Sequence, residues 1–242
     1  MKKIFELIKC DFKIFIREPM GAAFIIFFPL MMMVVSFIVD SGGSYFIEMI
    51  AGTIGLAIMS SSIMGVAIVI GINRETNIYK RYRISNIKEY MIFLSIFIVH
   101  TFLTLISTLL QFLLVAMIYG MDKLYSANLT GFVVDYFISV ILFFSIGICL
   151  SSIIKTLKNL HGITSLTFTI MMLLCGSAFP ISKMPNFMQK IVMVLPLSHI
   201  NSILYHDLTG DIVHKGILYI YAMVVIVICF GIGIKYFKWE VG

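Results

Sequence analysis

The sequence predicts an all-α membrane protein that crosses the bilayer several times. Hydrophobic residues make up 60% of the 242 residues and charged residues only 12%, and the mean hydropathy is +1.05. A soluble domain cannot bury so much apolar surface. Long uncharged windows are the second observation, because about 20 apolar residues rising 1.5 Å each cross the hydrocarbon core. We expect residues 1–242 to form one transmembrane domain.

Six windows lack Asp, Glu, Lys and Arg and have the length of a membrane-spanning helix. The expected transmembrane helices are 21–39, 49–72, 91–119, 136–154, 159–180 and 216–234. Most basic residues fall in the N-terminal segment, in the connections after the second and fourth windows, and at the C-terminus. The opposite side holds Lys123, Lys183, Lys190 and Lys215. This asymmetry predicts a multi-pass plasma-membrane protein with both termini in the cytoplasm. The net charge of +6 reflects topology and does not indicate a nucleic-acid partner.

Residues 1–20 are expected to form an amphipathic helix that lies in the cytoplasmic membrane interface. On a helix, charged side chains share one stripe and apolar side chains the opposite face. The charged stripe comprises Lys2, Glu6, Lys9, Lys13 and Arg17, and the apolar face comprises Ile4, Phe5, Ile8, Phe12, Phe15 and Ile16. Such a basic helix lies with its apolar face in lipid and its lysines near phosphates. A solvated helix packed on a soluble partner is the alternative.

The connection between the second and third windows, residues 73–90, is short and dense in charge of both signs. A positive-inside loop would explain its basic residues alone. The additional acidic residues and tyrosines favour a short helix that presents charge to a cytosolic partner. The residues expected to couple the chain to that partner are Arg74, Glu75, Lys80, Arg81 and Arg83.

Polar and small residues recur at helical spacing inside the second and third windows. His100, Thr104 and Gln111 share one face of the third, and Ser61 and Gly65 form a small-xxx-small pair in the second. Polar side chains within a span face other helices or a water-filled path. These five residues therefore either line a translocation path or pack helices together.

Residues 181–215 are apolar but interrupted by prolines, and both flanks lie on the predicted outer side. Proline lacks an N–H and ends a helix, so the segment is too broken to span. We expect an outer re-entrant segment between the fifth and sixth helices, with its irregular backbone sheltered by protein. The residues expected to shape an outer gate are Gly176, Phe179, Pro180, Pro185, Phe187 and Pro196. A purely structural cap on the helix bundle is the alternative.

This segment resembles the glycine–aromatic–proline pattern of the permease subunits of ABC type-2 exporters. The matching residues are Gly176, Phe179, Pro180, Met184, Pro185, Phe187, Met188, Ile191, Leu195 and Pro196. The interfacial helix, six spans and charged connection extend the resemblance over most of the chain. The connection departs from the family pattern, because Asn77 stands where a glycine is common and Asn86 where a proline is common.

The resemblance implies a non-catalytic permease that works with a second permease, identical or homologous, and two cytosolic ATPase subunits. The chain has no GxxxxGK[ST] phosphate loop, so ATP and Mg²⁺ are expected on the partner ATPase. No cofactor, catalytic residue or metal ligand is predicted for this chain. Asp207, Asp211 and His214 would share a helical face, but solvated loop residues are the favoured interpretation.

The expected cargo is amphiphilic: a membrane-active peptide, a hydrophobic drug or a lipid-like molecule. The outer connections are short, and 17 Met and 21 Phe supply adaptable apolar surface. A role in antimicrobial-peptide or drug resistance would fit. Export of a lipid-linked polysaccharide is the first alternative. An ion-coupled secondary transporter is the second, although the six windows contain no Asp, Glu, Lys or Arg.

Overall fold

A computed structural model describes residues 2–17, 23–39, 46–85, 87–119, 127–174, 185–211 and 215–237. Throughout these ranges the secondary structure is helical, without strands. The α-helices are α1 (Lys2–Arg17), α3 (Phe28–Val39), α4 (Phe46–Ser60), α5 (Ala67–Glu75), α6 (Ile78–Ile84), α7 (Glu89–Tyr119), α8 (Leu129–Ile153), α9 (Leu157–Leu174), α10 (Asn186–Val192), α11 (Pro196–Thr209) and α12 (Gly216–Tyr236). Two π-helical turns, η1 (Ala23–Phe27) and η2 (Ser61–Val66), join these helices.

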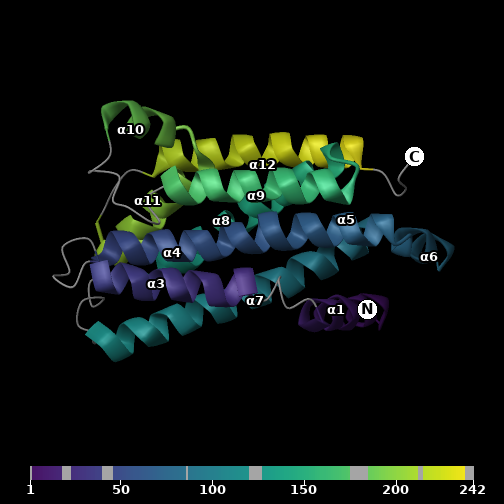
Figure 1. Ribbon diagram of the computed structural model, residues 1–242, viewed down its shortest axis with the longest axis horizontal. Coiled ribbons are helices and arrows are strands. Elements are labelled where there is room, and N and C mark those ends of the chain that lie inside the picture. The colour runs from purple at the N-terminus through teal and green to yellow at the C-terminus, as the bar shows by residue number, and fades with distance from the viewer. Residues whose placement is uncertain are drawn as a thin grey trace.

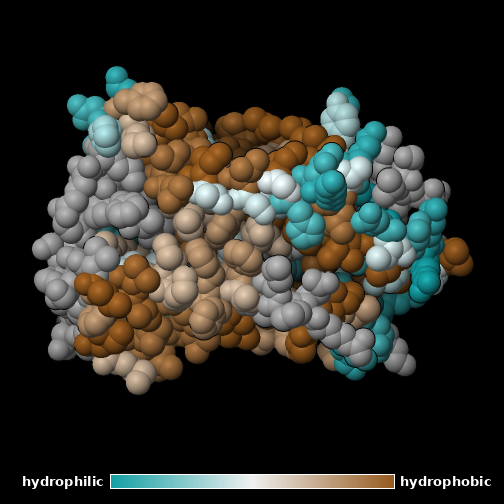
Figure 2. All heavy atoms as spheres, viewed as in Figure 1, coloured by the Kyte–Doolittle hydropathy of each residue, from teal (hydrophilic) through white to brown (hydrophobic). Residues whose placement is uncertain are grey.

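The long helices run roughly parallel to the longest axis of the molecule (Figure 1). Helices α1 and α6 lie at one end, which we call the α6 end, and α10 lies at the other, which we call the α10 end. Figure 2 shows apolar side chains over the middle of the molecule and many hydrophilic ones toward the α6 end. On this face the bundle is therefore apolar in the middle and more polar at the α6 end.

Within the described residues, four helical stretches are long and apolar enough to cross a membrane. They are Phe46–Glu75, Tyr90–Ile118, Leu129–Ile153 and Gly216–Tyr236. The number of such stretches rises to five if the bent pair α10 and α11 is taken as one span. The first predicted window holds a shorter apolar helix over Ala23–Ile38, and the fifth window holds α9, described to Leu174. The count of six spans therefore stays a prediction.

The span Phe46–Glu75 lies at the centre of the bundle, and 89% of its most apolar window is buried. Every residue from 49 to 63 is buried. Helix α11 packs against α4, and α8 packs against η2. Lipid is as apolar as leucine, so close van der Waals contact rather than hydrophobic transfer holds such helices together. Gly147 on α8 allows this contact, because a Cβ there would lie 2.6 Å from the carbonyl oxygen of Ser62.

The polar and proline residues at the α10 end set the boundaries of its helices. Asn128 caps α8, since its Oδ1 accepts a hydrogen bond from the Gly131 N–H at 3.0 Å. Pro196 occupies the first turn of α11, where its missing N–H leaves no gap in the helix. Gly210 ends α11 in the left-handed conformation, with φ of 74°. Helices α10 and α11 meet at 89°, so the chain turns sharply at Pro196.

Candidate functional site

The α6 end carries the charged connection, and its first basic residue points inward. The Arg74 side chain is 2% exposed. Its Nη1 donates to the Ser151 carbonyl and its Nη2 to the Ile154 carbonyl, both at 2.7 Å. These carbonyls lie at the C-terminal end of α8, where helices have unpaired acceptors. The guanidinium therefore ties the end of the central span to the end of α8.

The expected connection of residues 73–90 begins later than the sequence suggested, because α5 continues to Glu75. Asn77 then adopts the left-handed conformation with φ of 57°. Asparagine tolerates this conformation better than other non-glycine residues. The departure from glycine at this position therefore leaves the helix stop intact. Asn86, the second departure, lies outside the described residues.

Helix α6 presents charge on one side and tyrosine on the other. Glu75, Lys80 and Arg81 are exposed, whereas Tyr79 is completely buried. The Tyr79 ring packs at 5.8 Å from the ring of Phe237, which follows α12. Burial raises the pKa of the Tyr79 hydroxyl well above its ordinary value, so the phenol stays neutral. The placement of the Arg83 side chain is not among the described features.

Helix α1 packs along α7 at the same end. Its buried face consists of Leu7, Asp11 and Phe15, one helical turn apart. The Ser95 hydroxyl donates to Asp11 Oδ2 at 2.6 Å. Burial raises the pKa of Asp11 to about 6, and the Ser95 bond offsets only part of that rise. Phe5 and Ile16 stay exposed, so α1 keeps apolar surface that no described helix covers.

Three of the five expected path residues meet inside the bundle. The Ser61 hydroxyl and Nδ1 of His100 share a hydrogen bond of 3.1 Å. The His100 ring fills the space beside Gly65, where a Cβ would lie 2.5 Å from it. A cavity reaches both Gly65 and His100, and His161 of α9 and Phe15 of α1 also line it. The contact between Ser61 and His100 therefore lies next to the cavity, because His100 takes part in both.

The other two path residues are buried farther along α7. Thr104 donates to the carbonyls of His100 and Thr101 in its own helix. Gln111 is completely buried, and neither polar atom of its side chain has a hydrogen-bond partner among the described residues. A buried amide without partners is costly. Thr104 is thus satisfied by its own helix, whereas Gln111 has unused donors and acceptors.

The expected outer gate is described only in its second half. Gly176, Phe179 and Pro180 fall outside the described residues. Pro185 precedes α10, Phe187 on α10 is 72% exposed, and Pro196 stands at the 89° bend before α11. The described half is therefore a bent helical pair with an aromatic side chain on its surface.

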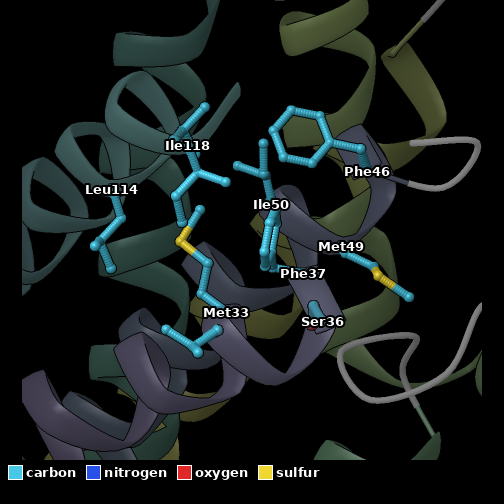
Figure 3. A pocket seen from close by; sticks show the side chains of 10 residues that line it. Met33, Ser36, Phe37, Phe46, Met49, Ile50, Leu114 and Ile118 are labelled. Atoms are coloured by element: carbon cyan, nitrogen blue, oxygen red, sulfur yellow. The ribbon is translucent and has the colours of Figure 1, made fainter. Parts of the chain in front are cut away.

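An apolar cavity lies near the α10 end between α3, α4 and α7 (Figure 3). Its wall is formed by aliphatic, methionine and phenylalanine side chains, together with one serine. The lining residues are Met33, Val34, Ser36, Phe37, Phe46, Met49, Ile50, Leu114, Val115 and Ile118. The Ser36 hydroxyl donates to the Met32 carbonyl at 2.8 Å, so the hydroxyl already has an acceptor within its own helix.

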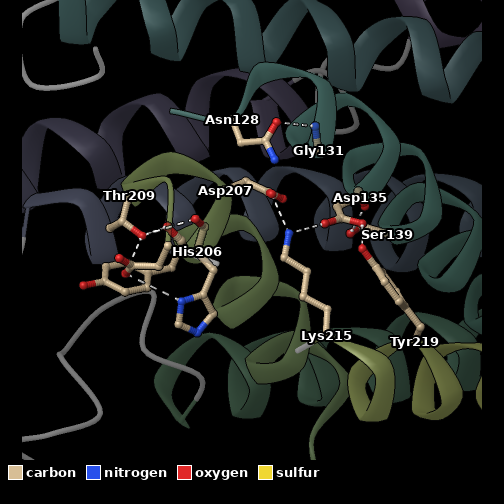
Figure 4. A network of polar contacts seen from close by, with 11 residues as sticks. Asn128, Gly131, Asp135, Ser139, His206, Asp207, Thr209, Lys215 and Tyr219 are labelled. Carbon is tan, nitrogen blue, oxygen red and sulfur yellow. Dashed lines mark hydrogen bonds and ion pairs between the residues drawn. The ribbon is translucent and has the colours of Figure 1, made fainter. Parts of the chain in front are cut away.

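An ion cluster that the sequence did not reveal joins α8, α11 and α12 (Figure 4). Lys215 Nζ donates to Asp135 Oδ2 at 2.6 Å and also to Asp207 Oδ1. The Tyr219 hydroxyl donates to Asp135 Oδ1 at 2.8 Å. Both carboxylates belong to residues that are 1% exposed. Asp135 directly precedes the predicted fourth window, which was the available signal, but nothing in its spacing indicates these partners.

The described residues place no group of three or more His, Cys, Asp or Glu side chains where a metal ion would fit. Asp207 turns toward Lys215, whereas Asp211 is exposed. His214, the third member of the set considered from the sequence, lies outside the described residues.

A protein-family model matches most of the chain. No curated protein matches the chain. The family model described as the ABC-2 type transporter matches residues 2–208, which include the charged connection and the bent pair α10 and α11. Because this match covers most of a chain whose helices are long and apolar enough to span a membrane, the protein belongs to the ABC-2 type transporter family, as a membrane-embedded permease component.

Proposed function

We propose that the chain is the permease subunit of an ATP-driven exporter that moves an amphiphilic substrate out of the cytoplasm or the inner leaflet. Two permeases, identical or homologous, would work with two cytosolic ATPase subunits that hold ATP and Mg²⁺. In this arrangement the chain spans the plasma membrane six times, with η1–α3 and α9 as the two shorter spans. The α6 end, with both termini, would face the cytoplasm.

The observation that carries the proposal is the tie between Arg74 and the end of α8. A partner that pushes on exposed Glu75, Lys80 and Arg81 would act on a segment that is hydrogen-bonded to a second span at 2.7 Å. Buried Tyr79 anchors the same segment near the end of α12. Movement of α6 would then be transmitted to three spans at once. Arg83 is assigned to the same docking surface by its sequence position.

Helix α9 supports the pairing of two permeases. His161, Ser165 and Thr169 recur one turn apart and are exposed on this helix. Acyl chains are a poor environment for an imidazole, so this face suits a neighbouring permease or an aqueous path. His161 also lines the cavity that reaches Gly65 and His100. Ser61, Thr104 and Gln111 would line the interior continuation of that path.

The cavity walls support an amphiphilic cargo. Met33, Met49, Phe37 and Phe46 give the cavity of Figure 3 a flexible apolar lining, and methionine adapts to irregular shapes. A membrane-active peptide, a hydrophobic drug or a lipid-like molecule has the required apolar surface. A growth assay with such compounds, with and without the permease and its ATPase, would identify the class. If the permease and its ATPase instead restore growth only to cells that are defective in polysaccharide export, the lipid-linked polysaccharide is the favoured cargo.

Gly176, Phe179 and Pro180, with Pro185, Phe187 and Pro196, are proposed to close the outer end of the path. The sharp bend between α10 and α11 supports this assignment, since it turns the chain back toward the same end. Phe179→Ala tests it. A gate that has lost its aromatic plug would raise ATP hydrolysis without cargo while the complex still assembles. Loss of thermal stability with a normal ratio of transport to hydrolysis would identify a cap instead.

The coupling role is tested by exchanging the exposed charges of the α6 end. The double variant Glu75→Arg with Arg81→Glu keeps the net charge and reverses the local pattern. We expect cargo export to fall at least about tenfold, the equivalent of roughly 1.4 kcal/mol of lost coupling, while the purified complex still hydrolyses ATP. Lys158→Glu, an exposed change elsewhere at this end, is the matched control.

Normal export by the double variant would remove the docking role from this surface. A hydrolysis-dead ATPase distinguishes the remaining alternative. Export that continues with the dead ATPase but stops when the proton or sodium gradient is collapsed would identify an ion-coupled transporter.

A further inference from the structure

The ion cluster at the α10 end holds unequal numbers of opposite charges. Asp135 and Asp207 supply two carboxylates, and Lys215 is the cation hydrogen-bonded to both. Burial opposes the charge of Lys215, but its hydrogen bonds to the two carboxylates outweigh this and raise its pKa. The ammonium group is therefore retained, and the fully ionised cluster carries one excess negative charge.

The neighbouring helices do not balance this charge. On α11, His206 lies 3.9 Å from Asp211 and is directed to that exposed carboxylate. Tyr219 of α12 donates a neutral hydrogen bond, and the charged side chain of α4, Glu48, is also acidic. Within the described ranges, Asp207 Oδ2 is buried without a hydrogen-bond partner. An unpaired buried oxygen on an ionised carboxylate is costly.

Two carboxylates that share one buried site favour the uptake of a proton by one of them. We propose that Asp135 and Asp207, bridged by Lys215, form a proton-binding site. The proton adds to one carboxylate oxygen and forms a carboxyl O–H, while Lys215 keeps its own proton. The charge of the cluster changes from −1 to zero, and no other reactant is needed. This inference does not depend on the proposed transport function.

Protonation has a defined structural consequence because each member of the cluster comes from a different helix. Lys215 precedes α12, Asp135 belongs to α8 and Asp207 to α11. Removing the excess charge relieves the buried repulsion while the bond from Lys215 to the remaining carboxylate stays in place. The bent outer pair is then held more firmly at acid pH than at alkaline pH. The sign follows from the folded state binding more protons than the unfolded state.

The direct test is infrared difference spectroscopy of the purified protein between about pH 8 and about pH 5, the range in which shifted carboxyl groups titrate. Because buried Asp11 also titrates in this range, every protein compared carries Asp11→Asn, and in this background we expect an acid-induced C=O band of a protonated carboxylic acid. Asp207→Asn and Asp135→Asn each leave one carboxylate for Lys215, so each should remove this band. Asp211→Asn changes an exposed carboxylate one turn away and should retain it. A band that survives both cluster variants would overturn the proposal.

Thermal unfolding over the same pH range supplies the second measurement. The melting temperature of the wild type should rise as the pH falls, and this rise should be smaller in both cluster variants than in Asp211→Asn. At about pH 8 the two Asn variants should be at least as stable as the wild type, because a carboxamide imitates the protonated carboxyl. Failure of both to fold, or an unchanged pH dependence in both, would contradict the proposed site.

Discussion

The central span Phe46–Glu75 and the last span Gly216–Tyr236 are both apolar helices, with mean hydropathies of 2.1 and 2.7, yet they occupy opposite environments. The most apolar window of the first is 89% buried and that of the second 11%. The difference lies in small and polar residues. The central span contains Ser60, Ser61 and Ser62, which are buried. The surface of α12 instead carries exposed apolar residues such as Ile220, Val227 and Ile228. Mean hydropathy therefore locates a span, but small and polar residues indicate its burial.

The strongest test of this contrast compares basic residues at the ends of the two spans. Arg74 donates two hydrogen bonds to α8 carbonyls, whereas Lys235 is exposed near its own neighbour Tyr236. We expect Arg74→Met to lower the free energy of unfolding by about 3 kcal/mol, since charged hydrogen bonds contribute about 1.5–3 kcal/mol each. Lys235→Met should leave it unchanged. Chemical denaturation in one detergent measures both.

Arg74→Lys refines this prediction, because an ammonium keeps the charge but loses the fork that reaches two carbonyls. Its stability should fall between those of the wild type and Arg74→Met. Equal stability of Arg74→Met and the wild type would show that the tie does not hold the central span.

The second test compares two glycines, one against the central span and one on α12. A Cβ on Gly147 would lie 2.6 Å from the backbone oxygen of Ser62, whereas one on Gly231 would meet nothing within 4 Å. Gly147→Ala should destabilise by about 1–3 kcal/mol through overpacking. Gly231→Ala should be neutral or stabilise by up to about 1 kcal/mol through helix propensity. Similar melting temperatures for the two variants would remove the distinction between the spans.

The test with the smallest expected effect on stability concerns α1, which has one face buried against α7. Because the pKa of Asp11 is raised to about 6 by burial, the folded state binds its proton more tightly than the unfolded state. The stability that α1 gains should be present at low pH and be lost as the pH rises through about 6, by at most about 3 kcal/mol. Proteolysis of α1 against pH measures this.

Asp11→Asn should remove that pH dependence, while the amide oxygen can still accept from Ser95. Glu6→Gln, which changes an exposed carboxylate on the same helix, should leave it unchanged. The assignment fails if the two variants respond to pH alike.

Much of the helical layout was predictable because charge and hydropathy act along the chain. The window 49–72 falls within Phe46–Glu75, and the window 216–234 within α12. The fourth helix extends beyond its window, since α8 begins at Leu129 and includes Asp135. A rule that ends windows at charged residues cannot recognise a carboxylate that is neutralised by Lys215 from another helix.

The site was less predictable, because its chemistry depends on contacts between distant segments. The sequence indicated that Arg74 is near the α6 end but not that its guanidinium turns inward to α8 carbonyls 77 and 80 positions away. It indicated an apolar face on residues 1–20 but not that Asp11 is buried within the helix contact. Of the five residues predicted to line a path or pack helices, Ser61, Gly65 and His100 come together in the structure, a contact that the spacing within each window did not indicate.

The π-helical turn η2 within the central span has a consequence for how that span is aligned. A π-helical turn accommodates one residue more than an α-helical turn, and each residue of an α-helix advances the rotation by roughly 100°. The turn therefore sets the azimuth of α4 relative to α5, and so decides which side chains of α4 face α11 when Arg74 faces α8. Deleting one residue between Ser61 and Val66 would let the turn close as an ordinary α-helix and leave the two halves of the span aligned, whereas an α-helical turn that kept all of these residues would rotate one half against the other by roughly 100°.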